Sequence, residues 1–392
     1  MKQKLVALSG NEAVAYAFKQ ARPHVASAFP ITPQTEMMHK YAEFVANGEV
    51  DTEMILVESE HSAMSAAVGS AAAGARTITA TSSAGFALMW EVVYIAASLR
   101  LPIQMALVNR ALSGNINIHC DHSDSMGGRD AGWIHMFCEN AQEAYDSALM
   151  NFRISEHPNV RIPAMTNYDG FIISHTADSL HMLDDDTAYR FVGDYRPAYT
   201  LLDTENPITV GPLDLTDYYF EHKWSQLEAQ KHVIPVAREV IREFGELTGR
   251  HYDLYEEYRL DDADLVMVVL GSSAGTTKDV IDEYREKGVK VGLLKMRLFR
   301  PFPHAELVNV LAGRKAVAVL DRSASFGGFG GPVFTEIRSA LYGKDQVPIH
   351  NWIYGLGGRD YEMKHAAEVI DSLQKIAAGE PLEPVNLLGV RL

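Results

Sequence analysis

The chain has 392 residues, 47% hydrophobic and 22% charged, which is enough apolar material for two or three packed domains. Its formal charge of −16, from 51 acidic and 35 basic residues, disfavours contact with phosphate backbones, so we expect no nucleic-acid binding. Two cysteines, Cys120 and Cys138, are too few for a disulfide scaffold or an iron–sulfur cluster. No apolar run suits a signal peptide or a membrane span, so we expect a cytoplasmic protein without membrane contacts.

Short apolar runs alternate with helix-length stretches over the first 170 residues. Alanine-rich helices are predicted at 62–73 and 85–99. The predicted strands are 25–29, 54–57, 77–79 and 103–108. Strands of continuous apolar character between helices indicate a mainly parallel sheet that is covered on both faces.

The second half of the chain repeats this pattern after an irregular region. Residues 176–258 carry several prolines and many tyrosines, and we expect them to wrap the first domain and to contain one long helix over 226–247. Further strands are predicted at 264–270, 289–294, 316–320 and 349–353. The prediction is therefore an α/β protein with two doubly wound, mainly parallel domains, 1–258 and 259–392.

Polar side chains follow three of the predicted strands. Thr32 lies between two prolines after the first strand, Glu60 follows the second, and Arg110 follows the strand 103–108. Ligands of open α/β sheets bind at the carboxyl ends of strands, where a carboxylate can exchange protons and a guanidinium can bind a carboxylate in a bidentate pair. The alternatives are a rigid loop at Thr32, a helix-capping acid at Glu60 and a surface arginine at Arg110.

The loop 119–124 contains the residue types that bind metals. His119, Asp121 and His122 are compatible with a zinc or manganese site, and a hydrolase or metalloenzyme built on them is an alternative function. No distant ligand is identified by spacing, so we expect no metal site and interpret the loop as polar residues near a ligand.

The segment Gly271–Gly275 follows a predicted strand and precedes a predicted helix. It lacks the lysine of a phosphate-binding loop and the full glycine spacing of a dinucleotide site. We interpret it as a tight turn, with an anion cradle as the alternative.

Ordered motifs along most of the chain carry a resemblance to a known family. They are Gly10–Ala15, Phe29–Gln34, Val57–Ala63, Thr79–Ser83, Asn109–Leu112 and Asp121–Met126 in the first half, and Arg300–Pro303, Val319–Arg322 and Gly355–Asp360 in the second. Together they resemble the α subunit of the multi-subunit 2-oxoacid:ferredoxin oxidoreductases, closest to the pyruvate:ferredoxin (flavodoxin) enzymes.

The resemblance implies half of an active site. Residues 1–258 would be a thiamine diphosphate pyrimidine-binding domain, and residues 259–392 a transketolase C-terminal-like domain. Thiamine diphosphate would be shared with a β chain. Mg²⁺ and [4Fe-4S] clusters would lie on partner chains among the β, γ and δ subunits. The lack of a diphosphate motif around Asn167–Gly170 agrees with this division. Coenzyme A would be a co-substrate, and ferredoxin or flavodoxin would accept the electrons.

The family's residue roles carry over by position. Glu60 matches the glutamate that bonds the aminopyrimidine ring nitrogen, Thr32 the hydroxyl that contacts the 2-oxoacid, and Arg110 the guanidinium that holds its carboxylate. Pro30, Ser83 and Phe86 would also bind the cofactor, and the substrate-side loop would include Asn115, Asn117, Asp121 and Asp124.

The implied reaction is oxidative decarboxylation of pyruvate to acetyl-CoA and CO2, or its reverse. Phe29 replaces the family's usual tyrosine, which removes one hydroxyl, and the retained Thr32 disfavours oxalate because the oxalate-specific relative has arginine there. The loop 114–118 resembles the pyruvate enzymes. The alternatives are a 2-oxoisovalerate enzyme subunit and a non-catalytic assembly subunit.

Overall fold

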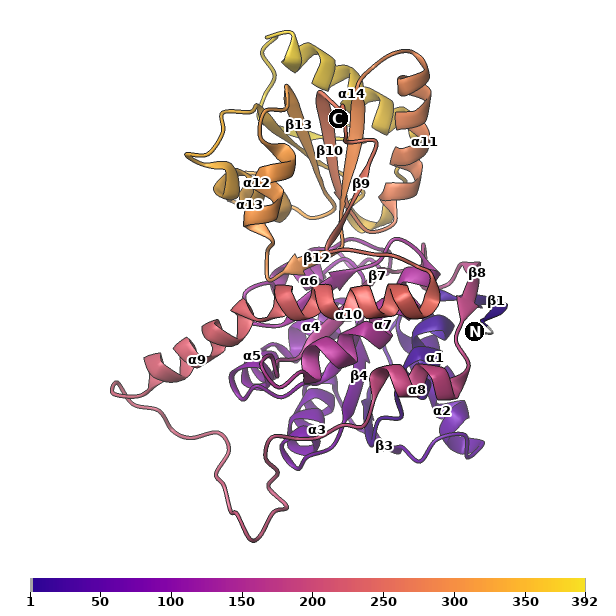
Figure 1. The fold of residues 1–392 in the computed structure, drawn as a ribbon, viewed down its shortest axis with the longest axis vertical. Helices are drawn as coiled ribbons and strands as arrows, with labels where there is room; N and C mark the ends of the chain where they lie inside the picture. Colours follow the sequence, from indigo (N-terminus) through magenta and orange to yellow (C-terminus); the bar gives the residue numbers. More distant parts are fainter. Residues whose placement is uncertain (1–2, 392) are drawn as a thin grey trace.

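Two mainly parallel sheets organise the chain in a computed structural model that describes residues 3–391 (Figure 1). The first sheet has the strand order β12-β6-β7-β5-β4-β2-β3, and only β12 runs antiparallel to its neighbour. Its strands are β2 (Val25–Ala28), β3 (Glu53–Leu56), β4 (Thr77–Thr81), β5 (Gln104–Asn109), β6 (Ile134–Phe137), β7 (Ala164–Asp169) and β12 (Leu298–Arg300).

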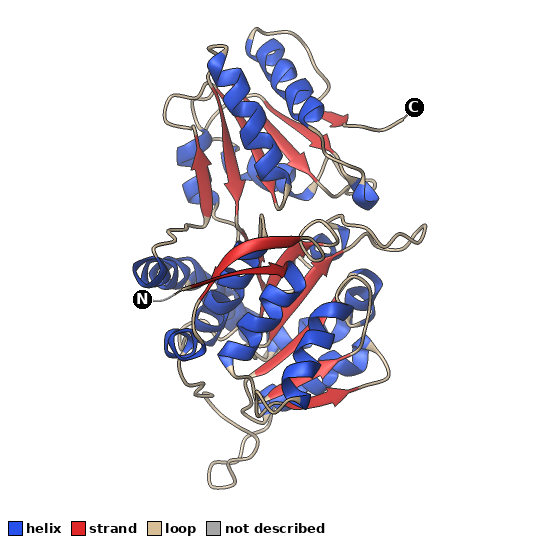
Figure 2. Ribbon diagram, turned by 90° about the vertical axis from the view of Figure 1, so that its right-hand side faces the viewer, coloured by secondary structure: helices blue, strands red, loops and turns tan. Residues whose placement is uncertain are grey.

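Helices cover both faces of this sheet (Figure 2). They are α1 (Gly10–Ala21), α2 (Thr35–Ala46), α3 (Glu60–Ala72), α4 (Ser83–Leu88), α5 (Trp90–Ser98), α6 (Ser123–Gly127) and α7 (Ala141–Glu156). Side chains alternate along β5, so that Ala106 and Val108 join one apolar core while Met105 and Leu107 join the other. Burial on both faces explains the continuous apolar runs in the sequence.

The second sheet repeats this construction. Its order is β15-β14-β13-β10-β11-β9, with β9 antiparallel to β11. The strands are β9 (Tyr255–Tyr258), β10 (Leu265–Leu270), β11 (Val291–Met296), β13 (Ala316–Asp321), β14 (Ile349–Ile353) and β15 (Val385–Leu387), and the helices are α11 (Ser273–Glu286), α12 (His304–Leu311), α13 (Pro332–Leu341), the short 3₁₀ turn Leu356–Gly358 and α14 (Met363–Ala377). The predicted α/β class with two doubly wound, mainly parallel sheets is confirmed.

Each sheet contains one strand from the part of the chain that mainly builds the other unit. β9 ends at Tyr258, the last residue of the predicted first domain, yet lies in the second sheet. β12 comes from the second half of the chain and extends the first sheet beside β6. The chain therefore crosses between the two units more than once.

The region 176–258 is more regular than predicted. β8 (Ala177–Met182) pairs with β1 (Lys4–Ser9) in a separate antiparallel ribbon, and α8 (Asp185–Val192) follows. The predicted single helix over 226–247 is wrong, because α9 (Tyr219–Lys231) and α10 (Val233–Thr248) meet at His232. Pro235 lies in the first turn of α10, where its missing N–H costs no helical hydrogen bond, so a new helix can begin there.

The predicted helix over 85–99 is also divided. α4 ends at Leu88 and α5 begins at Trp90, with Met89 between them in a non-helical conformation. Spacing of apolar residues continues across the break, which is why the sequence pattern did not reveal it.

Residues 193–218 contain no helix or strand and form an arm that extends away from the first domain before α9 (Figure 1). Large apolar side chains on the arm and α9 are exposed: Tyr199, Leu201, Leu202, Ile208, Leu213, Leu215, Tyr218, Tyr219, Phe220, Trp224 and Leu227. Within residues 3–391, no helix has both the length and the apolar character that crossing a bilayer requires.

Candidate active site

Four of the predicted site residues lie just beyond the carboxyl ends of neighbouring strands. Thr32 follows β2, Glu60 begins α3 after β3, Ser83 begins α4 after β4, and Arg110 follows β5. These strands are hydrogen-bonded neighbours and run parallel, so their carboxyl ends form one edge of the sheet. The topology therefore brings together residues that are up to 78 positions apart in the chain.

Glu60 presents a buried carboxylate at this edge. Its side chain is at the start of α3, where Ser59 caps the helix by accepting a hydrogen bond from the Ser62 N–H at 3.2 Å, and Glu60 itself is only 6% exposed. Among residues 3–391 no group hydrogen-bonds to this carboxylate and no cation lies within ion-pair distance of it. The carboxylate is thus not a helix cap, and its bonding capacity is open to a ligand.

Gly85 makes room for that carboxylate. A Cβ atom on Gly85 would lie 2.6 Å from Glu60 Oε1 and 2.6 Å from Thr81 Oγ1, so any side chain there would displace them. The hydroxyls of Thr81 and Ser82 are buried, and no hydrogen-bond partner for either lies in the described part of the chain. Polar atoms without a partner among the described residues therefore lie where α3 and α4 begin.

Arg110 presents a buried cation at the same edge. It is 6% exposed, its Nε donates to the Asn117 carbonyl oxygen at 2.9 Å, and its Nη1 donates to the Thr32 carbonyl oxygen at 2.9 Å. Burial lowers the pKa of Arg110, while the negative charge of Asp124 acts in the opposite direction. No carboxylate within the described residues forms an ion pair with it, so the guanidinium can bind a carboxylate ligand.

The loop after Arg110 is tied to the second domain. Asn117 Nδ2 donates to the Gly357 carbonyl oxygen at 2.9 Å, and the Gly357 N–H donates to Asp121 Oδ2 at 3.1 Å. Asn115 lies on the exposed part of the loop. Asn117 and Asp121 therefore attach the loop to the second domain.

Asp124 is buried among donors from the protein itself. Its two oxygens accept hydrogen bonds from the N–H groups of Ser83, Arg110 and Ser125 and from the side chain of Asn109, at 2.7–3.0 Å. Burial raises its pKa to about 6, although these hydrogen bonds act to lower it. These four donors from the protein itself satisfy the Asp124 carboxylate.

The remaining predicted cofactor residues follow β2 and β4 at the same edge of the sheet. Ser83 is buried with a left-handed φ of 47°, and its hydroxyl donates to the Ala111 carbonyl oxygen. Phe86 is buried and contacts the Trp90 ring edge-on, with 6.4 Å between centroids. Pro30 and the side chain of Thr32 are exposed at the end of β2.

The histidine-containing loop does not assemble as a single cluster. His119 is exposed against the ring of Phe171, whereas His122 is buried and its Nε2 lies 2.8 Å from Asp169 Oδ1. Asp121 is bound to Gly357, as above. The structure therefore does not bring His119, Asp121 and His122 together as the metalloenzyme alternative requires. His122 instead lies with Cys120 and Asp169, whose ligand atoms are within 4.8 Å of one another and of the imidazole.

Asp169 and Arg322 form an ion pair between the domains that the sequence analysis did not identify. Arg322 Nη1 lies 2.7 Å from Asp169 Oδ2, and both side chains are buried. Burial would raise the pKa of Asp169, but His122 and Arg322 hold it well below its usual range. In the sequence, Asp169 and Arg322 are only two charged residues at the ends of strands, and their spacing does not indicate that they form an ion pair.

The turn Gly271–Gly275 bonds to this same carboxylate. The Ser272 N–H and hydroxyl donate to Asp169 Oδ2 at 3.1 and 2.5 Å. Both interpretations of the turn are therefore partly right: it is a tight βα turn, and the anion that it cradles is a side chain of the first domain.

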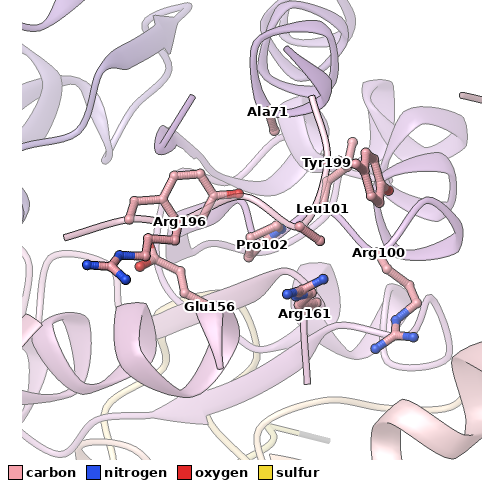
Figure 3. A pocket seen from close by; sticks show the side chains of 10 residues that line it. Ala71, Arg100, Leu101, Pro102, Glu156, Arg161, Arg196 and Tyr199 are labelled. Carbon is pink, nitrogen blue, oxygen red and sulfur yellow. The ribbon is translucent and has the colours of Figure 1, made fainter. Parts of the chain in front are cut away.

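A separate small hollow lies at the root of the arm (Figure 3). Arg100, Glu156, Arg161 and Tyr199 are among the residues that line it, and no predicted site residue does. Glu156 already accepts two hydrogen bonds from Arg76 at 2.8 Å, and the Tyr199 hydroxyl donates to the Leu99 carbonyl oxygen at 2.9 Å. The Tyr199 hydrogen bond attaches the arm to the first domain, and a donated bond from Arg76 Nη2 to the Gly193 carbonyl oxygen at 2.7 Å does the same.

Comparison with known proteins decides the family. Residues 16–242 match the pyruvate flavodoxin/ferredoxin oxidoreductase family in its thiamine diphosphate-binding region. The chain belongs to this family. Residues 263–366 match core domain II of pyruvate:ferredoxin oxidoreductase. The predicted resemblance is confirmed over both domains.

Individual relatives agree with this assignment. The pyruvate synthase subunit PorA of Thermotoga maritima is 55% identical over 367 residues, which covers 93% of each chain. PorA of Pyrococcus furiosus is 43% identical, covering 98% of this chain and 97% of that one. The ketoisovalerate oxidoreductase subunit VorA of Pyrococcus abyssi is 44% identical, covering 96% and 95%.

Two solved structures show the same fold at low sequence identity. The 2-oxoglutarate:ferredoxin oxidoreductase of Magnetococcus marinus, solved with 2-oxoglutarate, coenzyme A and succinyl-CoA, is 17% identical with a TM-score of 0.73, covering 95% of this chain and 65% of that one. A split-gene transketolase is 11% identical with a TM-score of 0.56, covering 96% and 100%.

Proposed function

We propose that this chain is the α subunit of a thiamine diphosphate-dependent, CoA-acylating 2-oxoacid:ferredoxin oxidoreductase, with pyruvate as the 2-oxoacid. The observation that carries the proposal is the buried carboxylate of Glu60, left without a partner within residues 3–391 at the sheet edge that also holds Arg110. Membership of the family supplies the reaction class.

The residues at this edge fit the pyrimidine half of the cofactor. Glu60 would hold a proton between its carboxylate and the aminopyrimidine ring nitrogen, and the unsatisfied hydroxyl of Thr81 borders the same space at Gly85. The aminopyrimidine ring would also contact Ser83, Phe86 and Pro30. When bound, thiamine diphosphate supplies a nucleophilic carbon and an electron sink for decarboxylation.

The substrate would bind on the Arg110 side. Arg110 would pair with the carboxylate of the 2-oxoacid, since its desolvated guanidinium has no acidic partner among the described residues. The Thr32 hydroxyl would contact the substrate, because the Thr32 carbonyl oxygen already bonds to Arg110 and places the residue beside it. Asn115 and Asn117 would line the loop side.

The diphosphate, Mg²⁺ and [4Fe-4S] sites would belong to partner chains. Asp169, in the segment that would correspond to a diphosphate motif, is fully engaged by His122, Arg322 and Ser272. Both cysteines of the chain are buried and unpaired. β, γ and δ subunits would supply these groups and deliver electrons to ferredoxin or flavodoxin, and coenzyme A would take the acyl group.

Exposed apolar side chains on the arm and α9 support the proposal that this chain assembles with other subunits. Leu213 is 89% exposed, and Phe220 and Trp224 on α9 are also exposed. Exposed large apolar side chains that gather in one segment are typical of protein–protein contact sites. We expect the partner subunits to cover it.

The test of substrate choice is a comparison of 2-oxoacids. The complex, purified from native cells, should show its highest kcat/KM for pyruvate over 2-oxoisovalerate, 2-oxoglutarate and oxalate in CoA-dependent reduction of a dye, with acetyl-CoA and CO2 as products. The similarity to VorA makes 2-oxoisovalerate the second candidate, and a preference for it would establish that alternative. Inactivity with every 2-oxoacid would overturn the proposal.

A further inference from the structure

The turn that begins α4 and the end of β5 meet at a single oxygen atom. Asp124 Oδ2 accepts a hydrogen bond from the Ser83 N–H at 3.0 Å and another from the Arg110 N–H at 2.9 Å. Ser83 lies at the proposed cofactor side and Arg110 at the proposed substrate side. One carboxylate therefore joins the two parts of the site.

The other oxygen of Asp124 anchors this joint. Oδ1 accepts from Asn109 Nδ2 at 3.0 Å and from the Ser125 N–H at 2.7 Å. Because all four partners are donors and the side chain is 1% exposed, only a group with two acceptor atoms satisfies them without water.

Two further hydrogen bonds reinforce the same joint. The Ser83 hydroxyl donates to the Ala111 carbonyl oxygen, and the Leu112 N–H donates to Ser123 Oγ at 2.9 Å. The left-handed backbone of Ser83, with φ of 47°, is held by the bond from its N–H to Asp124 and the bond from its hydroxyl to Ala111, since such a conformation is uncommon for a non-glycine residue.

We propose that Asp124 is a positioning residue: its carboxylate sets the spacing between the turn that carries Ser83 and the strand end that carries Arg110, so that cofactor and 2-oxoacid meet in register. This inference rests on the proposed function and assigns Asp124 a role other than substrate contact. It follows that a change at Asp124 affects the cofactor and the 2-oxoacid together.

The chain contains a matched control. Asp321, at the end of β13 in the second domain, is also 1% exposed and accepts hydrogen bonds from the Val333 and Phe334 N–H groups and from Asn351 Nδ2 at 2.9–3.1 Å. Its carboxylate caps α13, and none of its hydrogen-bond partners is a proposed site residue. Asp321→Asn therefore has a comparable cost to folding without the effect on the site.

The experiment compares Asp124→Asn and Asp321→Asn in the assembled complex. Either orientation of the asparagine at position 124 points an N–H₂ group at two donors, so we expect the KM for pyruvate to rise about tenfold or more. The affinity of the cofactor-free complex for thiamine diphosphate, measured by calorimetry, should fall by a similar factor, with the KM for CoA unchanged. Asp321→Asn should lower the thermal midpoint with none of these effects.

The outcomes separate this inference from the proposed function. Equal KM and cofactor affinity in Asp124→Asn and Asp321→Asn, in a complex where Glu60→Gln abolishes activity, would overturn the positioning role and leave the function intact. If Asp124→Asn does not assemble, Asn109→Ala removes one of the four donors and should raise the KM for pyruvate by about two- to tenfold. An unchanged KM in that variant would also contradict the inference.

Discussion

Arg110 and Thr32 are joined by a hydrogen bond from the Arg110 guanidinium to the Thr32 carbonyl oxygen at 2.9 Å, although 78 positions separate them in sequence. The bond connects the ends of β2 and β5. Residues proposed to contact the same substrate are thus adjacent, and the backbone of one orients the side chain of the other.

Arg110→Lys should raise the KM for the 2-oxoacid at least tenfold, which corresponds to about 1.4 kcal/mol or more, because lysine cannot form a bidentate pair or keep both carbonyl contacts. Steady-state kinetics of the complex measure this. Arg76→Lys is the control, since Arg76 is a buried arginine paired with Glu156 outside the site. An unchanged KM in Arg110→Lys would favour a non-catalytic assembly subunit.

Asp169→Asn should destabilise the contact between the domains. The substitution leaves the buried guanidinium of Arg322 without its ion pair, a change that typically costs about 3–5 kcal/mol. Differential scanning calorimetry should show a lower midpoint. Lys315→Gln, which removes the exposed pair with Asp264, should change the free energy of unfolding by less than about 1 kcal/mol. Similar midpoints for the two variants would contradict this account.

Stability should fall at low pH in part through Glu143. Burial acts to raise the pKa of Glu143, but Arg297 and Lys295 outweigh it and lower the pKa to about 2. The unfolded chain binds the proton at a higher pH than the folded chain. The stabilisation is therefore complete above the unfolded pKa, about 4.3, and is lost as the pH falls toward 2. Urea unfolding at pH 5 and pH 3 should show a smaller loss in Glu143→Gln than in the wild type, and equal losses would contradict the assignment.

Leu213→Ser combined with Phe220→Ser should weaken assembly of the complex. Both side chains are exposed, so the substitutions remove no core contact and the thermal midpoint of the separate chain should not change. Co-purification with the partner subunits measures the effect. Full recovery of the complex would show that the arm is not a subunit interface.

Much of the architecture was predictable because strands that are buried on both faces of a sheet have continuous apolar sequences. β10 is apolar throughout and β5 is apolar from Met105 to Val108, and the residues after these two strands are polar or glycine. Two features were not predictable in this way. The helical spacing of apolar residues continues across the break at Met89. The ribbon of β1 with β8 depends on pairing between two segments that are distant in the sequence.

The candidate site was predictable to the same degree. Strand-end position placed Thr32, Glu60 and Arg110 at one edge of the sheet, as the parallel order requires. The function of Asp124 as a joint could not be read from the sequence, because an aspartate in a polar loop has the same appearance whether its partners are ligand atoms or backbone N–H groups.

The most direct test of the account is Glu60→Gln in the assembled complex. Glutamine preserves the volume of the side chain but cannot hold the proton at the aminopyrimidine ring nitrogen, so 2-oxoacid-dependent dye reduction should fall by about 10²-fold or more. Glu58→Gln, two residues away and exposed, should retain full activity. Full activity of Glu60→Gln would contradict the central claim that this carboxylate serves the cofactor.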